Sequence, residues 1–420
     1  MKSRRLVLQA CFALAAALAA AAPPPRPPIG SPRFYPAKVK ALSEMVARQL
    51  SQAPAPGLPA GTRVFALLVP HAGLKYSGPT AARAYKALKP GQFDAVVVLG
   101  TSHYKELENA ALYPGPYATP EGALPYDEAL AKELLSAAPA IKADAAAHAK
   151  EYSIEVQLPY ISRAAGRVPL VALVMNTQDL DAARQVGRAL AKAAAGRRLL
   201  IIASTDQSHY PEGKTADAVD RTTLLSLSAV DPAYFWLTNR FLMNRGVPHL
   251  AVTYCGEAAV TAAAEAARAL GADRFVTLGH LNSGDVVSER EYNHVVGYGS
   301  GLFVKEPGAA PAGLELSAAQ RAALLDAARK AMEGKAAKTG LSPEPALNLP
   351  AIVSLTLRAG DGSVIGKAGD AQPQDSLLEA VARLAAAAAP ARKAPMDRPG
   401  LKIEIAVSRG PVFAAQSFAD

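Results

Sequence analysis

The chain has 420 residues, of which 50% are hydrophobic and 19% are charged, and this composition excludes an intrinsically disordered protein. The length is enough for two or three ordinary domains. The formal net charge is +9, but the Lys and Arg residues form no long basic block, so we expect no nucleic-acid partner.

The first 22 residues have the three parts of an export signal. A cationic stretch with Arg4 and Arg5 precedes an apolar run at 6–22, and a Pro-rich linker at 23–31 follows. Ser3-Arg4-Arg5 also resembles a twin-arginine signal, which exports proteins already folded. A membrane anchor is the alternative, but the run is short for a full span. We expect a periplasmic or extracellular protein without stable membrane insertion after signal removal.

Apolar runs alternate with helical patterns over residues 32–304. The runs at 64–69, 94–99, 168–174 and 199–203 predict strands, and the patterns at 80–88, 180–194 and 257–270 predict helices. Uniformly apolar strands between helices are typical of a sheet that is buried on both faces. The sequence therefore predicts an α/β domain with a layered sheet and helices on both faces.

A linker at 305–315 separates this domain from a smaller one at 316–420. There we expect helices at 317–334 and 376–389 and strands at 351–357 and 401–407, which is an α+β pattern. This part of the chain contains no His and no Cys, so any metal chemistry belongs to the first domain. The two domains are expected to be able to contact each other.

Chemistry-bearing residues follow the predicted strands. His71 and His103 each come just after a strand, where ligands of α/β sheets bind. Cys255 stands at the start of a predicted helix, which favours its thiolate, and export would leave it without a disulfide partner. Asp206 and His209 follow another strand and are three residues apart, so that one turn brings them to the same side.

Two imidazoles and a thiolate indicate a site for one metal ion. This ligand set suits copper or zinc, and iron(II) becomes a candidate when Asp206 or His209 joins or supports it. Three protein ligands leave a coordination position open, as catalytic sites require. Cys255 acting as a nucleophile with a histidine base is a competing use of the same residues.

Each residue also has a purely structural interpretation. A histidine at a strand end is often only hydrogen-bonded, a lone thiol is often only buried, and Asp206 with His209 can simply cap a helix. The other histidines lack comparable surroundings and are interpreted as structural: His148, His249, His280 and His294.

Seven ordered motifs within 32–304 resemble the Memo-like family, also called AmmeMemoRadiSam system protein B. They are P-H-A-G-x-x-Y-S-G at 70–78, G-T-S-H at 100–103, E-x-S-I-E-V-Q-L-P at 151–159, S-T-D-x-S-H-Y at 204–210, C-G at 255–256, N-S-G-D at 282–285 and V-V-G-Y at 295–298. The resemblance implies a fold similar to class III extradiol dioxygenases, which are non-haem iron enzymes. It maps the metal ligands onto His71, His103 and Cys255, with Asp206 and His209 nearby.

The chain departs from the family at two places. The family commonly has a histidine where this chain has Tyr152, so a phenol replaces an imidazole near the site. Residues 316–420 resemble AmmeMemoRadiSam system protein A, but the Arg and Cys of its L-R-G-C-I-G motif are missing at 361–366. We therefore expect a degenerate domain that docks or stabilises.

Together these features predict an exported metal-binding protein with redox or dioxygenase-like chemistry on a small organic substrate. The iron(II) and copper ions are the leading candidates, and zinc is the third. Two other functions stay open: non-catalytic handling of copper or iron, and an interaction module that retains the metal site.

Overall fold

The computed structural model describes residues 24–286, 293–308, 315–335, 340–369, 375–389, 401–408 and 416–419. The export signal predicted at 1–22 lies outside these ranges and stays a prediction. Among the helices within them, none combines the length and the apolar character that a membrane crossing needs.

The first domain is built on an eight-stranded sheet in the order β6-β3-β7-β2-β8-β1-β10-β9. Its centre is parallel, because β2 pairs in parallel with β7 and β8, and β1 pairs in parallel with β8. Strands β10 and β9 extend the sheet antiparallel beyond β1. The strands are β1 (Arg63–Val69), β2 (Ala95–Thr101), β3 (Ala110–Leu112), β6 (Ile141–Ala143), β7 (Leu170–Met175), β8 (Leu199–Ser204), β9 (Arg274–Asn282) and β10 (Gly297–Lys305).

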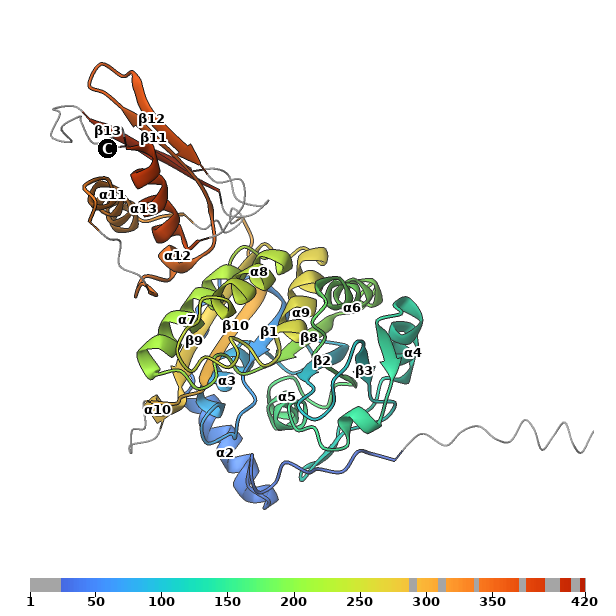
Figure 1. Cartoon of the computed structure of the whole chain (residues 1–420). Helices are drawn as coiled ribbons and strands as arrows, with labels where there is room; N and C mark the ends of the chain where they lie inside the picture. Colours follow the sequence, from blue (N-terminus) through green and yellow to red (C-terminus); the bar gives the residue numbers. More distant parts are fainter. Residues whose placement is uncertain are drawn as a thin grey trace, which may run out of the picture.

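Helices cover both faces of this sheet, as Figure 1 shows, and the predicted fold class is confirmed. Successive side chains of a strand point to opposite faces, so Leu68 of β1 joins one core while Leu67 and Val69 join the other. Helices α2 (Val39–Gln52), α3 (Gly78–Tyr85) and α5 (Leu158–Ala164) cover the second core, and α4 (Glu128–Ala137), α6 (Leu180–Ala193), α8 (Pro232–Met243) and α9 (Glu257–Ala269) cover the first.

The four apolar runs and the three helical patterns appear close to their expected bounds. Strands β9 and β10 were not expected, and their composition explains why. Most side chains of β9 are only partly buried, and β10 begins with small residues, so neither forms a continuous apolar run. Helix α7 (Gly213–Leu227) contacts both strands. The remaining short elements are α10 (Ser283–Val286), the pair β4 (Ala118–Thr119) and β5 (Gly122–Ala123), and the 3-10 helices η1 (Ala146–His148) and η2 (Glu155–Gln157).

The smaller domain has a four-stranded sheet in the order β12-β11-β13-β14, with helices packed on one core. Its elements are α11 (Ala318–Met332), α12 (Pro345–Asn348), β11 (Ile352–Arg358), β12 (Val364–Gly369), α13 (Leu377–Ala388), β13 (Lys402–Ser408) and β14 (Gln416–Ala419). Both long helices begin with a capping box, at Ser317 with Gln320 and at Ser376 with Glu379.

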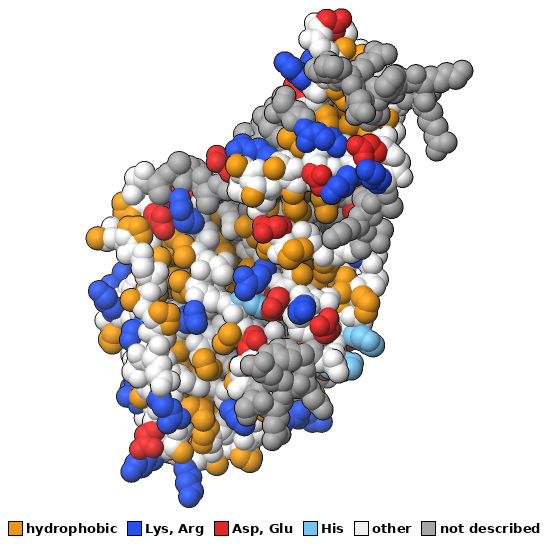
Figure 2. All heavy atoms as spheres, turned by 90° about the vertical axis from the view of Figure 1, so that its left-hand side faces the viewer, with side chains coloured by type: hydrophobic (Ala, Val, Ile, Leu, Met, Phe, Trp, Pro, Cys, Tyr) orange, Lys and Arg blue, Asp and Glu red, His pale blue; other side chains and the backbone are white. Residues whose placement is uncertain are grey.

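Polar contacts join the two domains where α12 meets α7. Asn348 Nδ2 donates to Thr222 Oγ1 at 3.2 Å, and the Tyr234 hydroxyl donates to the Pro350 carbonyl at 3.1 Å. On the face drawn in Figure 2, basic and acidic side chains are interspersed, so the described residues of this face show no continuous patch of one sign.

The structure differs from the expectation of a linker at 23–31. Arg26 lies within this segment, but its side chain is only 3% exposed and pairs with buried Glu155. This buried ion pair fixes the segment to the first domain at Arg26, while residues 24, 25 and 27–29 remain exposed.

Candidate metal centre

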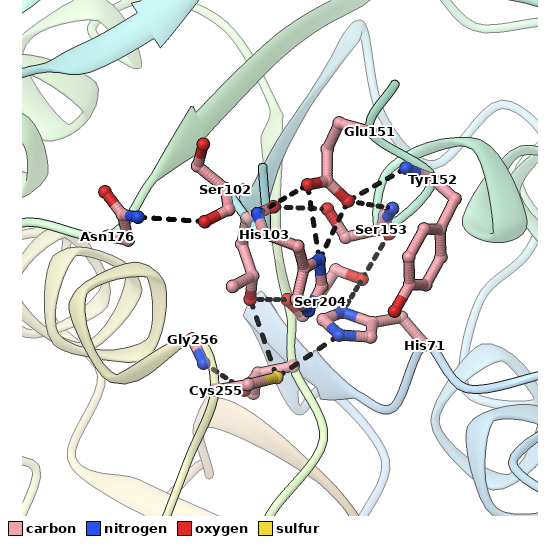
Figure 3. Close-up of polar contacts among 12 residues, drawn as sticks. His71, Ser102, His103, Glu151, Tyr152, Ser153, Asn176, Ser204, Cys255 and Gly256 are labelled. Atoms are coloured by element: carbon pink, nitrogen blue, oxygen red, sulfur yellow. Dashed lines mark hydrogen bonds and ion pairs between the residues drawn. The ribbon is translucent and has the colours of Figure 1, made fainter. Parts of the chain in front are cut away.

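The parallel strands bring the predicted site residues to one edge of the sheet. Strands β2, β8 and β1 are neighbours and run in the same direction. His103, Asp206 and His71 each stand two residues beyond the end of one of these strands. Because the carboxyl ends of parallel strands share an edge, three segments far apart in the sequence converge there (Figure 3).

Cys255 reaches the same place from the start of α9. The N-cap residue Gly256 packs so closely on the strand ends that a Cβ there would lie 2.7 Å from Thr101 Oγ1 and from the Thr205 Cβ. Glycine is required for this approach, which brings the preceding thiol onto the sheet edge. The Gly256 amide also donates to Thr205 Oγ1 at 2.8 Å.

The side chains of His71, His103 and Cys255 point toward one another (Figure 3). One potential ligand atom from each lies within 4.8 Å of the others. Cys255 Sγ is 3.2 Å from His71 Nε2, and the two imidazole rings meet edge to face with centroids 5.0 Å apart. The structure thus assembles a His/His/Cys group that can hold a metal ion.

Each histidine is oriented through its other ring nitrogen. His103 Nδ1 lies 3.0 Å from Glu151 Oε1, and His71 Nδ1 lies 3.3 Å from Ser204 Oγ. In both residues Nε2 is therefore the atom left for a metal. Such partners set the tautomer and the ring orientation of metal-binding histidines.

Charges within the group favour the anionic sulfur. Burial alone would raise the pKa of the Cys255 thiol, but His71, His103 and His209 lower it well below its usual value. Burial would lower the pKa of His103, but Cys255 and Glu151 raise it to about 10. These shifts favour a proton on His103 beside an anionic sulfur, so a divalent cation would bind in competition with protons.

Asp206 and His209 lie beside this group. Asp206 Oδ1 accepts from the backbone amides of His71 at 2.7 Å and Ala72 at 3.1 Å, and its own amide donates to Cys255 Sγ at 3.3 Å. The buried Nε2 of His209 has no hydrogen-bond partner among the described residues. Burial would lower the pKa of His209, but Cys255 and Asp206 raise it.

Tyr152, where the resemblance leads us to expect a histidine, packs on the rings of both His71 and His103. Its ring lies parallel to that of His103, with centroids 5.0 Å apart and planes 4° apart, and meets His71 edge to face at 5.9 Å. Phe34 stacks on its other side, with centroids 3.6 Å apart. The hydroxyl end points toward His71 in Figure 3.

Sequence reasoning did not assign roles to Glu151 and Ser204. Both lie in the motifs quoted above, and the position of Glu151 between two motifs with a histidine after a strand could have indicated a role for it.

Among the histidines interpreted as structural, His148 is buried and its Nε2 donates to the Ala111 carbonyl at 2.8 Å. His280 Nε2 lies 2.9 Å from Asp220 Oδ2, away from the His/His/Cys group.

A family model described as Memo-like protein matches residues 26–302, which include every residue of this site. The chain belongs to the Memo-like family. The match starts at Arg26 and ends before the smaller domain, so the family assignment concerns the first domain.

Curated relatives of the Memo-like family align over nearly their whole length. A MEMO1 family protein from Nitrosopumilus maritimus is 30% identical over 283 residues, covering 66% of this chain and 99% of the relative. One from Methanopyrus kandleri is 33% identical over 288 residues, covering 66% and 98%. Among solved structures, an uncharacterized Escherichia coli K12 protein has a TM-score of 0.38 at 14% identity, covering 57% of this chain and 99% of that chain.

Proposed function

We propose that this Memo-like protein is an exported metal-dependent enzyme that performs redox chemistry of the dioxygenase type on a small organic substrate. The observation that carries the proposal is the convergence of ligand atoms from His71, His103 and Cys255 within 4.8 Å. The donor set fits a metal, because both imidazoles present Nε2 and the thiol is held as a thiolate.

Iron(II) or copper would be held by these three residues, with zinc as the third candidate. Iron or copper bound there would supply redox chemistry, whereas zinc would supply only Lewis acidity, and three protein ligands would leave a coordination position for substrate. Glu151 and Ser204 keep the two imidazoles in the tautomer that presents Nε2. Asp206 holds the backbone of the His71 loop, which fixes the direction of that ligand.

Two groups are placed to handle a proton or to bind substrate. The buried Nε2 of His209 lacks a partner among the described residues, so a bound molecule or water can satisfy it. Tyr152 exposes a phenol where the family has an imidazole, and burial, then Asp206, raises its pKa. Tyr152 therefore stays protonated at neutral pH, and its hydroxyl keeps an O–H that can donate a hydrogen bond as well as lone pairs that can accept one.

A cleft of about 250 Å³ lies beside Cys255 and is also lined by Arg240, Met243 and Glu257, but neither His71 nor His103 lines it. His103 keeps 22% of its side chain exposed. We propose that a small substrate approaches Cys255 from this cleft, whose volume lies just below that of ordinary small-ligand pockets.

One experiment separates the enzyme from the other functions. The protein is purified from its native compartment, its metal is measured by elemental analysis, and oxygen consumption is followed with catechol-type substrates. Cys255→Ser serves as the site variant and Arg184→Met, on α6, as the control. Bound metal with turnover that requires Cys255 supports the proposal. Bound metal without turnover indicates metal handling or an interaction module that retains the metal site, and a wild-type protein without metal would contradict the proposal.

For the smaller domain we infer a docking or stabilising role. This domain has a four-stranded sheet with helices packed on one core, and residues 361–366 carry neither the Arg nor the Cys of the motif expected from the resemblance. Its contacts with α7 and α8 support a stabilising role for the first domain. Deleting residues 315–420 should lower the melting temperature of the first domain without changing its metal content, and an unchanged melting temperature would exclude stabilisation.

A further inference from the structure

The segment at 24–35 crosses the first domain beside the metal site and is held by buried polar contacts. Arg26 is its central anchor. The Arg26 guanidinium donates from Nε to the His148 carbonyl at 2.8 Å, from Nη1 to Glu155 Oε2 at 2.5 Å, and from Nη2 to the Glu151 carbonyl. Both partners of the ion pair are buried, with 3% of Arg26 and none of Glu155 exposed.

Glu155 in turn fixes the rest of this segment. Its carboxylate accepts from the Gly30 amide at 2.8 Å, from the Ile29 amide at 3.0 Å and from the Tyr35 hydroxyl. The ion pair thus ties two ends of the segment to the loop that runs from residue 148 to 155. We call residues 24–35 the N-terminal strap.

The loop under the strap carries the residues that contact His103. The Glu151 carbonyl binds Arg26, while the Glu151 carboxylate accepts from the His103 amide at 2.7 Å and faces its Nδ1 at 3.0 Å. Phe34 of the strap stacks on Tyr152, and Tyr152 stacks on His103. Two independent chains of contact therefore run from the strap to one metal-binding imidazole.

We propose that Arg26 is a positioning residue of the metal centre, acting from the N-terminal strap through Glu151 and Tyr152 on His103. The inference rests on the proposed metal site. Only arginine offers several fixed donors in one plane, and here they bind three carbonyl or carboxylate groups on separate parts of the loop. The contact with the Glu151 carbonyl links Arg26 directly to the residue whose carboxylate orients His103.

The test uses the full chain with Arg26→Met and Arg26→Lys. Arg184→Met is the matched control, because Arg184 Nε binds a similarly buried carboxylate, Glu265, at 3.2 Å, on helices α6 and α9. Two quantities are measured: the Kd for Zn²⁺ by competition with a chelator, and the imidazole ¹⁵N signals of His103 in the metal-free protein. The second does not depend on metal and reports the His103–Glu151 hydrogen bond directly.

We expect Arg26→Met to weaken Zn²⁺ binding by about 10–100-fold and to shift the His103 signals. Arg26→Lys should restore only part of the affinity, since an ammonium cannot reproduce the planar fork. The control also loses an arginine from a buried carboxylate, although Glu265 keeps Arg188 and Arg268 as partners, and it should keep the wild-type Kd and signals. Wild-type Kd and unshifted His103 signals in Arg26→Met would overturn the inference.

Two further outcomes are distinguished: a variant that does not fold, and a wild-type protein that binds no metal. Should Arg26→Met fail to fold, Arg26→Lys decides, because it keeps a positive charge beside Glu155 but loses the planar fork that binds the Glu151 carbonyl. Unchanged Zn²⁺ affinity and unchanged His103 signals in that variant would also overturn the inference. Should the wild type bind neither Zn²⁺ nor Co²⁺, the proposed function fails, and the metal-free His103 signals alone decide the role of Arg26.

Discussion

Replacing Glu151 by glutamine tests how His103 is held in the proposed metal site. The Glu151 carboxylate is fully buried and accepts from the backbone amides of His103 at 2.7 Å, Tyr152 at 2.8 Å and Ser153 at 2.8 Å, besides facing His103 Nδ1. Glutamine keeps the shape but loses the charge, and its NH₂ group would face an N–H donor. At least one buried donor would therefore be left unsatisfied.

The structure sets the size of the effect. Burial would raise the pKa of Glu151, but the hydrogen bond and charge of His103 lower it from 4.5 to about 2. A difference of this size corresponds to about 3 kcal/mol of folding stability. Since the folded-state pKa is the lower one, this stability is present above about pH 4.5 and is lost as the pH falls toward 2. Cys255 also contributes to the raised pKa of His103, so the lowered pKa of Glu151 is the better measure of the interaction between Glu151 and His103.

Urea unfolding followed by the fluorescence of the single tryptophan, Trp236 in α8, measures this difference. We expect Glu151→Gln to lose about 3 kcal/mol at pH 7 and only about 2 kcal/mol at pH 3.5, and to weaken Zn²⁺ binding by about 10–100-fold. Glu133→Gln, in a half-exposed pair with Arg197, is the control and should cost about 0–1 kcal/mol. Equal stability of Glu151→Gln and wild type at pH 7, or a gap that does not change with pH, would refute the reasoning.

Three further predictions address the helix start, a buried histidine and the export signal. Gly256→Ala places a methyl group 2.7 Å from Thr101 Oγ1, so it should lower the folding stability by about 1–3 kcal/mol and weaken Zn²⁺ binding. The control Gly73→Ala, whose new Cβ would have its nearest contact at 3.6 Å, should change neither. Equal melting temperatures of the two variants would contradict this prediction. Burial lowers the pKa of His148 to about 4, so its share of stability is present above pH 6.5 and is lost as the pH falls. The fall in unfolding free energy between pH 7 and pH 4 should therefore be about 3 kcal/mol smaller in His148→Asn, and an identical fall in both proteins would exclude this source. Replacing Arg4 and Arg5 by lysine should stop export, measured by cell fractionation; unchanged export indicates the unfolded route, and full-length protein in membranes indicates an anchor.

The central strands of the sheet could be predicted because burial on both faces leaves a simple mark. Strand β2 is apolar over most of its length and all of it is buried, so composition alone reveals it. Strand β9 has mostly half-buried side chains, and its place at the sheet edge depends on pairing with β10, which no local pattern encodes. The burial of Arg26 could not be predicted either, because the local sequence of a proline-rich segment does not show whether a distant carboxylate such as Glu155 pairs with its arginine.

The candidate site, like the fold, could be predicted from the sequence only in part. His71, His103 and Cys255 stand out in the sequence because strand ends and helix starts are places where ligands bind, and their residue types already define a metal-binding donor set. Which nitrogen each histidine presents was decided by Glu151 and Ser204, whose side chains arrive from other segments. The stacking of Tyr152 between Phe34 and His103 also required three distant segments to dock. The sequence by itself thus determined the donor atoms, because these are covalent properties of single residues. Only the tertiary structure decided their orientation and charge, because hydrogen bonds and burial arise between segments that meet after folding.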